Sequence, residues 1–116
     1  MSFGQVVTLK SLSEIRDNIS LDIVDARHWR EVRSEEHPDD KRNKSAAEIF
    51  ERLDDSVVNI PDDVLREYDL LWQCREDGTT LSELWAETLR QVGFSSEPGS
   101  ATEMVQRFIE EGRRLD

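Results

Sequence analysis

The sequence predicts an α/β domain with a small, mainly parallel sheet covered by helices on both faces. Short runs of β-branched and apolar residues alternate along the chain with stretches whose apolar residues recur at helical spacing. A chain of 116 residues is long enough for one compact domain and too short for two ordinary ones. We therefore expect residues 1–116 to form a single domain.

Three strands are expected in the first half of the chain, at residues 6–9, 21–26 and 57–60, where β-branched or apolar residues cluster. Between the first two of them, Ser11 and Glu14 form a capping box, the pattern in which a serine and a glutamate three residues later close the start of a helix. This pair predicts a short helix between the first two strands.

A polar segment follows the second expected strand, from about residue 28 to residue 45. Its residues are almost all charged or polar, which is typical of a long exposed loop. A second capping box, Ser45 with Glu48, predicts a short helix with Ala46, Ile49, Phe50 and Leu53 on one side.

The segment of residues 62–71 fits two structures. Val64, Leu65 and Tyr68 have helical spacing, whereas the apolar residues 70–72 fit a buried strand equally well. With the strand, the order of elements becomes the alternation that is typical of an α/β layer.

Two further capping boxes, Thr80 with Glu83 and Ser100 with Glu103, predict the last two helices. The first of these helices has a strongly periodic apolar face over residues 81–92.

Acidic residues dominate the charge of the chain. There are 26 Asp and Glu against 15 Lys and Arg, which gives a formal net charge of −11. Such a surface repels phosphates and anionic lipids, so nucleic acid and membranes are disfavoured as partners. The uncharged runs are too short to cross a bilayer, and the N-terminus lacks a secretory pattern, so we expect a cytoplasmic protein.

Cys74 is the single cysteine, and it excludes an internal disulfide or a multi-cysteine metal site. The histidines His28 and His37 have no third ligand at a convincing spacing, so no metal site is predicted. The tryptophans Trp29, Trp72 and Trp85 are expected in or at the edge of the core, and Trp72, close before Cys74, is also a candidate for the mouth of a pocket.

If residues 70–73 form a strand, Cys74 lies where a strand ends and a loop turns into a helix. Main-chain amides and the helix dipole at such a place stabilise a thiolate or a bound anion. Arg75 would add a positive charge there, whereas the carboxylates of Glu76 and Asp77 would act against it.

Four stretches of the chain, in this order, resemble the single-domain rhodanese-like proteins. Residues 21–27 resemble the family's apolar strand that ends in Asp-x-Arg, and residues 57–61 resemble its Asn-Ile-Pro strand. Residues 70–80 are similar to its strand and Cys-Arg active loop. Residues 81–94 are similar to the helix after that loop, with its terminal Gly-Phe.

The resemblance implies a sulfurtransferase. Cys74 would take sulfur from a small sulfane-sulfur donor such as thiosulfate, carry it as a persulfide, and pass it to cyanide, a thiol or a protein acceptor. No cofactor is implied, because the thiol performs the covalent step itself. Asp25 and Arg27 would support the loop from beneath. The residues implied in binding the donor are Arg75, Glu76, Asp77, Gly78, Thr79 and Thr80.

Two alternatives stay open. Glu76 and Asp77 stand where small or basic residues are common in the family, which is compatible with a catalytically silent, acidic interaction module whose partner surface is the segment of residues 28–45. Alternatively, reading residues 62–76 as one helix gives a ribbon-helix-helix DNA-binding regulator or antitoxin. Ten acids against three arginines between residues 54 and 94 oppose that second alternative.

Overall fold

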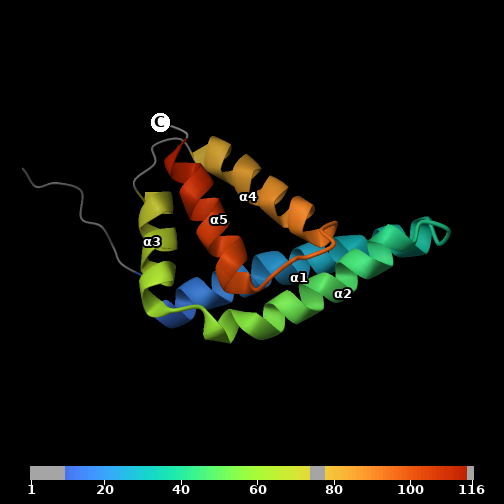
Figure 1. Ribbon diagram of the computed structural model, residues 1–116, viewed down its shortest axis with the longest axis horizontal. Coiled ribbons are helices and arrows are strands. Elements are labelled where there is room, and N and C mark those ends of the chain that lie inside the picture. The colour runs from blue at the N-terminus through green and yellow to red at the C-terminus, as the bar shows by residue number, and fades with distance from the viewer. Residues whose placement is uncertain (1–9, 74–77, 115–116) are drawn as a thin grey trace, which may run out of the picture.

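The computed structural model describes residues 10–73 and 78–114, and 84% of these described residues are helical. The prediction of an α/β fold is wrong, because no strand occurs in either described range. The chain instead forms a helical bundle (Figure 1). Its elements are α1 (Leu12–Glu36), α2 (Lys41–Ser56), a single 3-10 turn η1 (Val57–Asn59), α3 (Asp62–Gln73), α4 (Gly78–Gly93) and α5 (Ala101–Arg113).

The helices α1 and α2 form a long antiparallel hairpin, whose closed end extends beyond the rest of the bundle (Figure 1). The expected strand at residues 21–26 and the expected loop at residues 28–45 both lie in this hairpin, so both predictions are wrong. Ile23 is fully buried, whereas Leu21 is 60% and Val24 is 41% exposed. The apolar residues of this run therefore lie on two faces of one helix. Because they are close together in the sequence, they look like the apolar residues of a strand.

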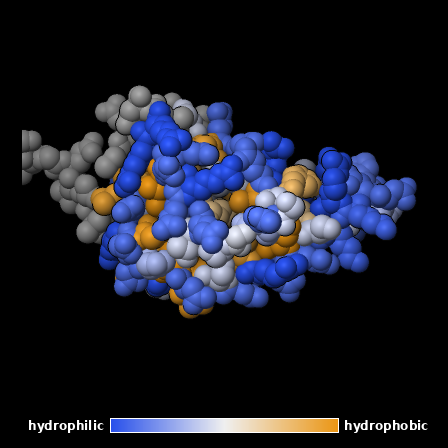
Figure 2. Space-filling view, viewed as in Figure 1, coloured by the Kyte–Doolittle hydropathy of each residue, from blue (hydrophilic) through white to orange (hydrophobic). Residues whose placement is uncertain are grey.

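Most of the polar segment of residues 28–45 is helical because α1 and α2 need only a narrow strip of apolar residues to pack against each other. The closed end of the hairpin is almost entirely hydrophilic on the face seen in Figure 2. On α2, the residues that face inward are Asn43, Ala46, Phe50 and Leu53. Two helices paired in this way can carry charged residues over most of their circumference.

Two of the predicted caps are confirmed. The Ser11 hydroxyl accepts a hydrogen bond from the Glu14 main-chain N–H (3.1 Å), and Ser100 accepts one from Glu103 (3.3 Å). By contrast, α2 begins one turn before the predicted start, and its cap is Asp40 instead of Ser45. Each confirmed cap satisfies a main-chain donor that the first turn of a helix leaves unpaired.

The strand predicted at residues 57–60 is wrong as well, because residues 57–59 form the single turn η1. The ambiguous segment after Pro61 is the helix α3, with Val64, Leu65 and Tyr68 buried. Residues 70–73 are the last turn of that helix, which corrects the expectation that an extended strand leads into Cys74.

An aromatic cluster joins α3, α4 and α5. The ring of Phe108 on α5 is fully buried and lies 5.6 Å from Tyr68, 5.6 Å from Trp72 and 4.9 Å from Trp85, centroid to centroid. In Figure 1, α5 runs between α3 and α4, and it packs against both. The core of the bundle therefore has α5 at its centre, and this arrangement holds α4 over the hairpin.

None of the described helices is long and apolar enough to span a membrane.

Candidate functional site: a tryptophan-lined groove

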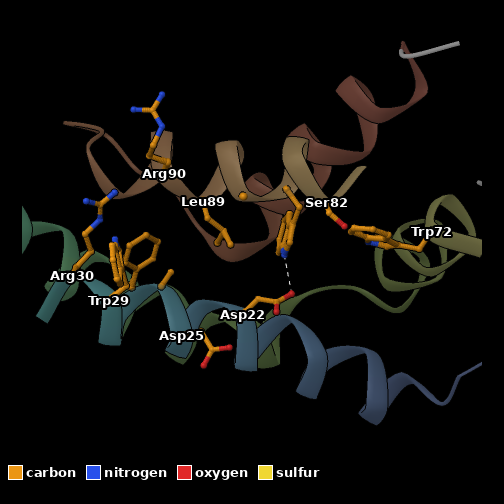
Figure 3. A pocket seen from close by; sticks show the side chains of 12 residues that line it. Asp22, Asp25, Trp29, Arg30, Trp72, Ser82, Leu89 and Arg90 are labelled. Atoms are coloured by element: carbon orange, nitrogen blue, oxygen red, sulfur yellow. Dashed lines mark hydrogen bonds between the residues drawn. The ribbon is translucent and has the colours of Figure 1, made fainter. Parts of the chain in front are cut away.

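All three tryptophans of the chain line one open groove of about 530 Å³ between α1 and α4. Trp29 comes from α1, Trp72 from the end of α3 and Trp85 from α4, and Figure 3 shows α1 and α4 on opposite sides of the groove. Residues far apart in the sequence thus meet at one surface.

Helical spacing places each wall of the groove. On α1 the lining residues follow the i, i+3, i+4, i+7, i+8 pattern of a single helix face, and the same pattern recurs on α4. The α1 wall is made of Asp22, Asp25, Ala26, Trp29 and Arg30. The α4 wall is made of Ser82, Trp85, Ala86, Leu89 and Arg90.

Small side chains leave the space open. Ala26 on one wall, and Ser82 and Ala86 on the other, stand where larger residues would close the gap between the helices. The floor is apolar, since Phe50 and Trp85 are buried beneath it. Trp85 is held by edge-on packing against Tyr68, with ring centroids 5.5 Å apart. This part of the floor is therefore already formed before any ligand binds.

Trp29 is different, because 57% of its surface is exposed to solvent at the rim of the groove. Trp29 and Arg30 line the same end of the groove (Figure 3). A tryptophan exposed next to an apolar groove is typical of a surface that a binding partner covers.

One end of the groove is acidic. Asp22 accepts a hydrogen bond from the indole Nε1 of Trp85 (2.8 Å; Figure 3). Burial raises the pKa of the Asp22 carboxyl, the hydrogen bond from Trp85 acts to lower it, and the charge of Asp25 raises it. Within the described ranges, neither Asp22 nor Asp25 lies at salt-bridge distance from a cation.

The other end is basic. The Arg30 guanidinium lies 4.2 Å from the centroid of the Phe94 ring, and its Nη1 donates to Asn43 Oδ1 (3.3 Å). Burial lowers the pKa of Arg30, and the positive charges of Arg33 and Arg90 lower it further. In a chain of net charge −11, this clustering of arginines is a local exception.

The residues implied by the rhodanese resemblance are spread over α1, the start of α4 and a segment outside the described residues. Cys74, Arg75, Glu76 and Asp77 lie outside the described residues. Gly78, Thr79 and Thr80 form the first turn of α4.

Asp25 and Arg27 lie on α1, not at the end of a strand. Arg27 pairs with Glu31 one turn further along the same helix (3.0 Å). Of the residues implied by the resemblance whose positions the structure describes, Asp25 lines the groove.

His28 and His37 belong to no cluster that could hold a metal. Across residues 10–73 and 78–114, no group of three or more His, Cys, Asp or Glu side chains is arranged for metal binding.

The prediction that the tryptophans lie in or at the edge of the core is confirmed for Trp85 and Trp72 but is wrong for Trp29, which is 57% exposed. The groove itself was not predicted. The sequence contains one indication of the α1 wall of the groove, because Asp22, Ala26 and Trp29 have the spacing of one helix face. It was hidden because a strand was assigned to residues 21–26, which divided the helix at the site.

No family model, no curated protein and no solved structure matches this chain. The resemblance to the rhodaneses therefore consists of short sequence matches alone. At residues 21–27, 57–59 and 70–73 these matches are helical where the family has strands.

Proposed function

We propose that this chain is a non-catalytic interaction module that docks an amphipathic helix of a protein partner in the groove between α1 and α4. The observation that carries the proposal is the presence of all three tryptophans on this one groove. The proposal is the interaction-module alternative with a changed partner surface: of residues 28–45, Trp29 and Arg30 line the groove, and the rest of the lining comes from outside that segment.

The shape of the groove supports a helical partner. Its two walls are helices of 25 and 16 residues, and in helical bundles a third helix packs against two such neighbours. Helix-in-groove recognition uses apolar anchors at i, i+3, i+4 and i+7 against a hydrophobic floor. Phe50, Trp85 and Leu89 supply such a floor here.

The chemistry of the groove supports a partner that buries aromatic surface. Tryptophan and arginine are the residues most enriched at energetically important positions of protein interfaces. Trp29 and Arg30 both belong to the α1 wall, and Trp29 exposes most of its surface. Covering Trp29 would remove a large apolar area from water.

The described residues give no support to sulfur transfer or to DNA binding. Residues 70–73, which were expected to form a strand before Cys74, are the last turn of α3. The described residues also contain no sheet of the kind on which the rhodanese active loop is built. The ribbon-helix-helix alternative correctly treats residues 62–73 as helical, but its strand at residues 57–60 is replaced by η1.

The proposal is tested with synthetic amphipathic helices of about 18 residues that carry leucine at helical spacing and contain no tryptophan. Their polar faces are all lysine, all glutamate, or mixed. Because all three tryptophans line the groove, docking is followed through the intrinsic tryptophan fluorescence of the full chain. We expect saturable binding of at least one peptide, with a Kd of about 1–100 μM.

Ala86→Glu is the groove variant, because Ala86 is exposed on α4 and lines the groove. Gln106→Glu is its control, because it makes the same change of charge at an exposed position of α5 outside the groove. We expect Ala86→Glu to weaken binding at least about tenfold and Gln106→Glu to leave it unchanged. Equal binding by both variants, or no saturable change with any peptide, would contradict the proposal.

A further inference from the structure

The face of α1 that lines the groove has acidic residues toward its N-terminal end and basic residues toward its C-terminal end. From the N-terminal side it presents two acids, then Ala26 and Trp29, then two arginines. These positions are separated by 3, 4, 7, 8 and 11 residues from the first, which places them in one stripe along the helix. The stripe consists of Asp22, Asp25, Ala26, Trp29, Arg30 and Arg33.

Contacts in the structure support a common face for the arginine end. The guanidinium of Arg33 lies 5.6 Å from the centroid of the Trp29 ring, and the positive charge of Arg33 lowers the pKa of Arg30. Arg33 is itself exposed, and its ion pair with Glu36 is long at 3.8 Å. The arginine end is therefore available to carboxylates from outside the molecule.

We propose that the helix docked in the groove is α1 of a second copy of this chain, packed antiparallel across a two-fold axis that passes between Ala26 and Trp29. This inference rests on the proposed function of the groove. In this register, positions whose numbers add to 55 face each other. Asp25 then faces Arg30 of the second copy, and Asp22 faces Arg33.

The charges of the groove become paired in this dimer. A two-fold axis makes an interface self-complementary, so each acid–arginine contact occurs twice. Neither Asp22 nor Asp25 has a cation at salt-bridge distance in the described part of one chain, and the neighbours that shift the pKa of Arg30 are cations. An antiparallel copy supplies the missing opposite charge at both ends.

The shape of the stripe fits the same arrangement. Ala26 faces Trp29 of the second copy, so a large side chain meets a small one on each side of the axis. Trp29, 57% exposed in one chain, enters the groove beside Ala86, where about 530 Å³ is open. Aromatic anchors in small-residue pockets are typical of the centre of protein interfaces.

The net charge of −11 opposes self-association, but mainly at long range. Salt at physiological strength screens charges separated by more than about 8 Å, while charges in contact across the interface are screened less. Local pairing of Asp25 with Arg30 can therefore act against the overall repulsion.

The test is sedimentation equilibrium of the full chain between about 10 μM and about 1 mM, with charge reversals at the central pair. We expect the native chain to form a dimer. Asp25→Arg makes both central contacts arginine against arginine, and Arg30→Glu makes both carboxylate against carboxylate. Each variant alone should therefore dimerise at least about tenfold more weakly.

Mixing the two variants gives the matched rescue. In a dimer of one chain of each, one central contact pairs the two introduced side chains, a guanidinium with a carboxylate, and the other pairs native Asp25 with native Arg30. Both contacts then carry opposite charges, so we expect an equimolar mixture to form this mixed dimer.

Trp29→Ala gives an independent test, because Arg30 also contacts Asn43 and Phe94 and its replacement can disturb the fold. Val58→Ala is the control, since Val58 is an exposed apolar residue (70%) outside the groove. We expect Trp29→Ala to weaken the dimer at least about tenfold and Val58→Ala to leave it unchanged.

A native chain that stays monomeric up to about 1 mM would overturn the inference, and so would a dimer that Asp25→Arg and Trp29→Ala leave intact. These outcomes are distinct from failure of the groove as a docking site. Suppose that the chain is monomeric but still binds a synthetic helix, and that Ala86→Glu weakens this binding. This result would exclude a second copy as the occupant of the groove and would support the proposed function.

Discussion

Asp22 links the electrostatics of the groove to the stability of the fold. Its carboxylate is half-buried and accepts a hydrogen bond from Trp85, which connects α1 to α4 across the base of the groove. Burial raises its pKa above the usual 3.8 despite this hydrogen bond, and the nearby charge of Asp25 adds to the increase. The site therefore keeps a carboxylate where the charged form is disfavoured.

The sign of the pH effect follows from this shift. The folded chain binds the Asp22 proton more tightly than the unfolded chain does, so this group makes the free energy of unfolding fall as pH rises from 3.8 through the raised pKa. Asp22→Asn keeps an oxygen that can accept from Trp85 and removes the charge. We expect this variant to be more stable than the native chain at neutral pH and equal to it below both pKa values.

Urea unfolding at neutral and acidic pH, at a protein concentration low enough to keep the chain monomeric, measures this difference. Asp17→Asn, at an exposed position of the same helix, is the control and should change stability by no more than about 0.5 kcal/mol at either pH. A destabilised Asp22→Asn variant at neutral pH would show that the carboxylate stabilises the folded chain, against our account.

At the scale of elements, the helices are set by their caps and by narrow apolar faces. Ser100 caps α5, and the neighbouring main-chain N–H of Ala101 donates to the Ser56 hydroxyl at the end of α2 (3.0 Å). Gly93 ends α4 where an added Cβ would lie 2.7 Å from Cζ of buried Phe50. The C-terminal end of α4 and the N-terminal end of α5 therefore both contact α2 of the hairpin.

Ser100→Ala removes the side-chain acceptor for the Glu103 N–H while it leaves the core unchanged. We expect the free energy of unfolding to fall by about 1 kcal/mol, the usual value of such a cap. Ser96→Ala in the preceding loop, at an exposed position, is the control and should have almost no effect. Thermal or urea unfolding followed by circular dichroism measures both variants, and equal stability of the two would contradict the role of the cap.

The sequence allowed some of these elements to be predicted. The caps at Ser11 and Ser100 and the apolar face over residues 81–92 are local signals, and the structure confirms them. The hairpin could not be predicted in the same way. Along the 25 residues of α1 only Ile15, Ile19 and Ile23 are buried, so its helical periodicity is weak in the sequence.

The groove depends on contacts between elements, and this explains why most of it escaped prediction. Trp72 is predicted at the mouth of a pocket around Cys74, which lies outside the described residues, whereas in the structure it lines the groove between α1 and α4. Its neighbours in the groove belong to α1 and α4, whose proximity is set by packing through α5 and α2. Local propensity carries no information about such long-range packing.

At the scale of the whole molecule, the aromatic cluster around Phe108 couples the elements. Phe108 contacts Tyr68 and Trp72 of α3 and Trp85 of α4, and Trp85 in turn is hydrogen-bonded to Asp22 of α1. Through these contacts α5 supports two of the three tryptophans of the groove. The stability of the bundle and the shape of the groove therefore depend on the same ring.

Phe108→Ala should lower the free energy of unfolding by about 3–5 kcal/mol, because it leaves a cavity at the centre of the bundle. Phe94→Ala is the control. Phe94 is 42% exposed, and its loss should cost less than about 1.5 kcal/mol. Urea unfolding measures both variants, and a Phe108→Ala variant as stable as Phe94→Ala would contradict the central place of this ring.

The most direct test of the groove as a docking surface is a heteronuclear NMR titration that follows the three indole N–H signals of Trp29, Trp72 and Trp85. With the synthetic amphipathic helix that binds most tightly as the probe, the account predicts that all three signals shift together and saturably. It also predicts that the main-chain signals of exposed Glu48 and Glu51 on α2, which do not line the groove, stay in place. Indole signals that stay fixed while signals elsewhere on the surface shift would contradict the account.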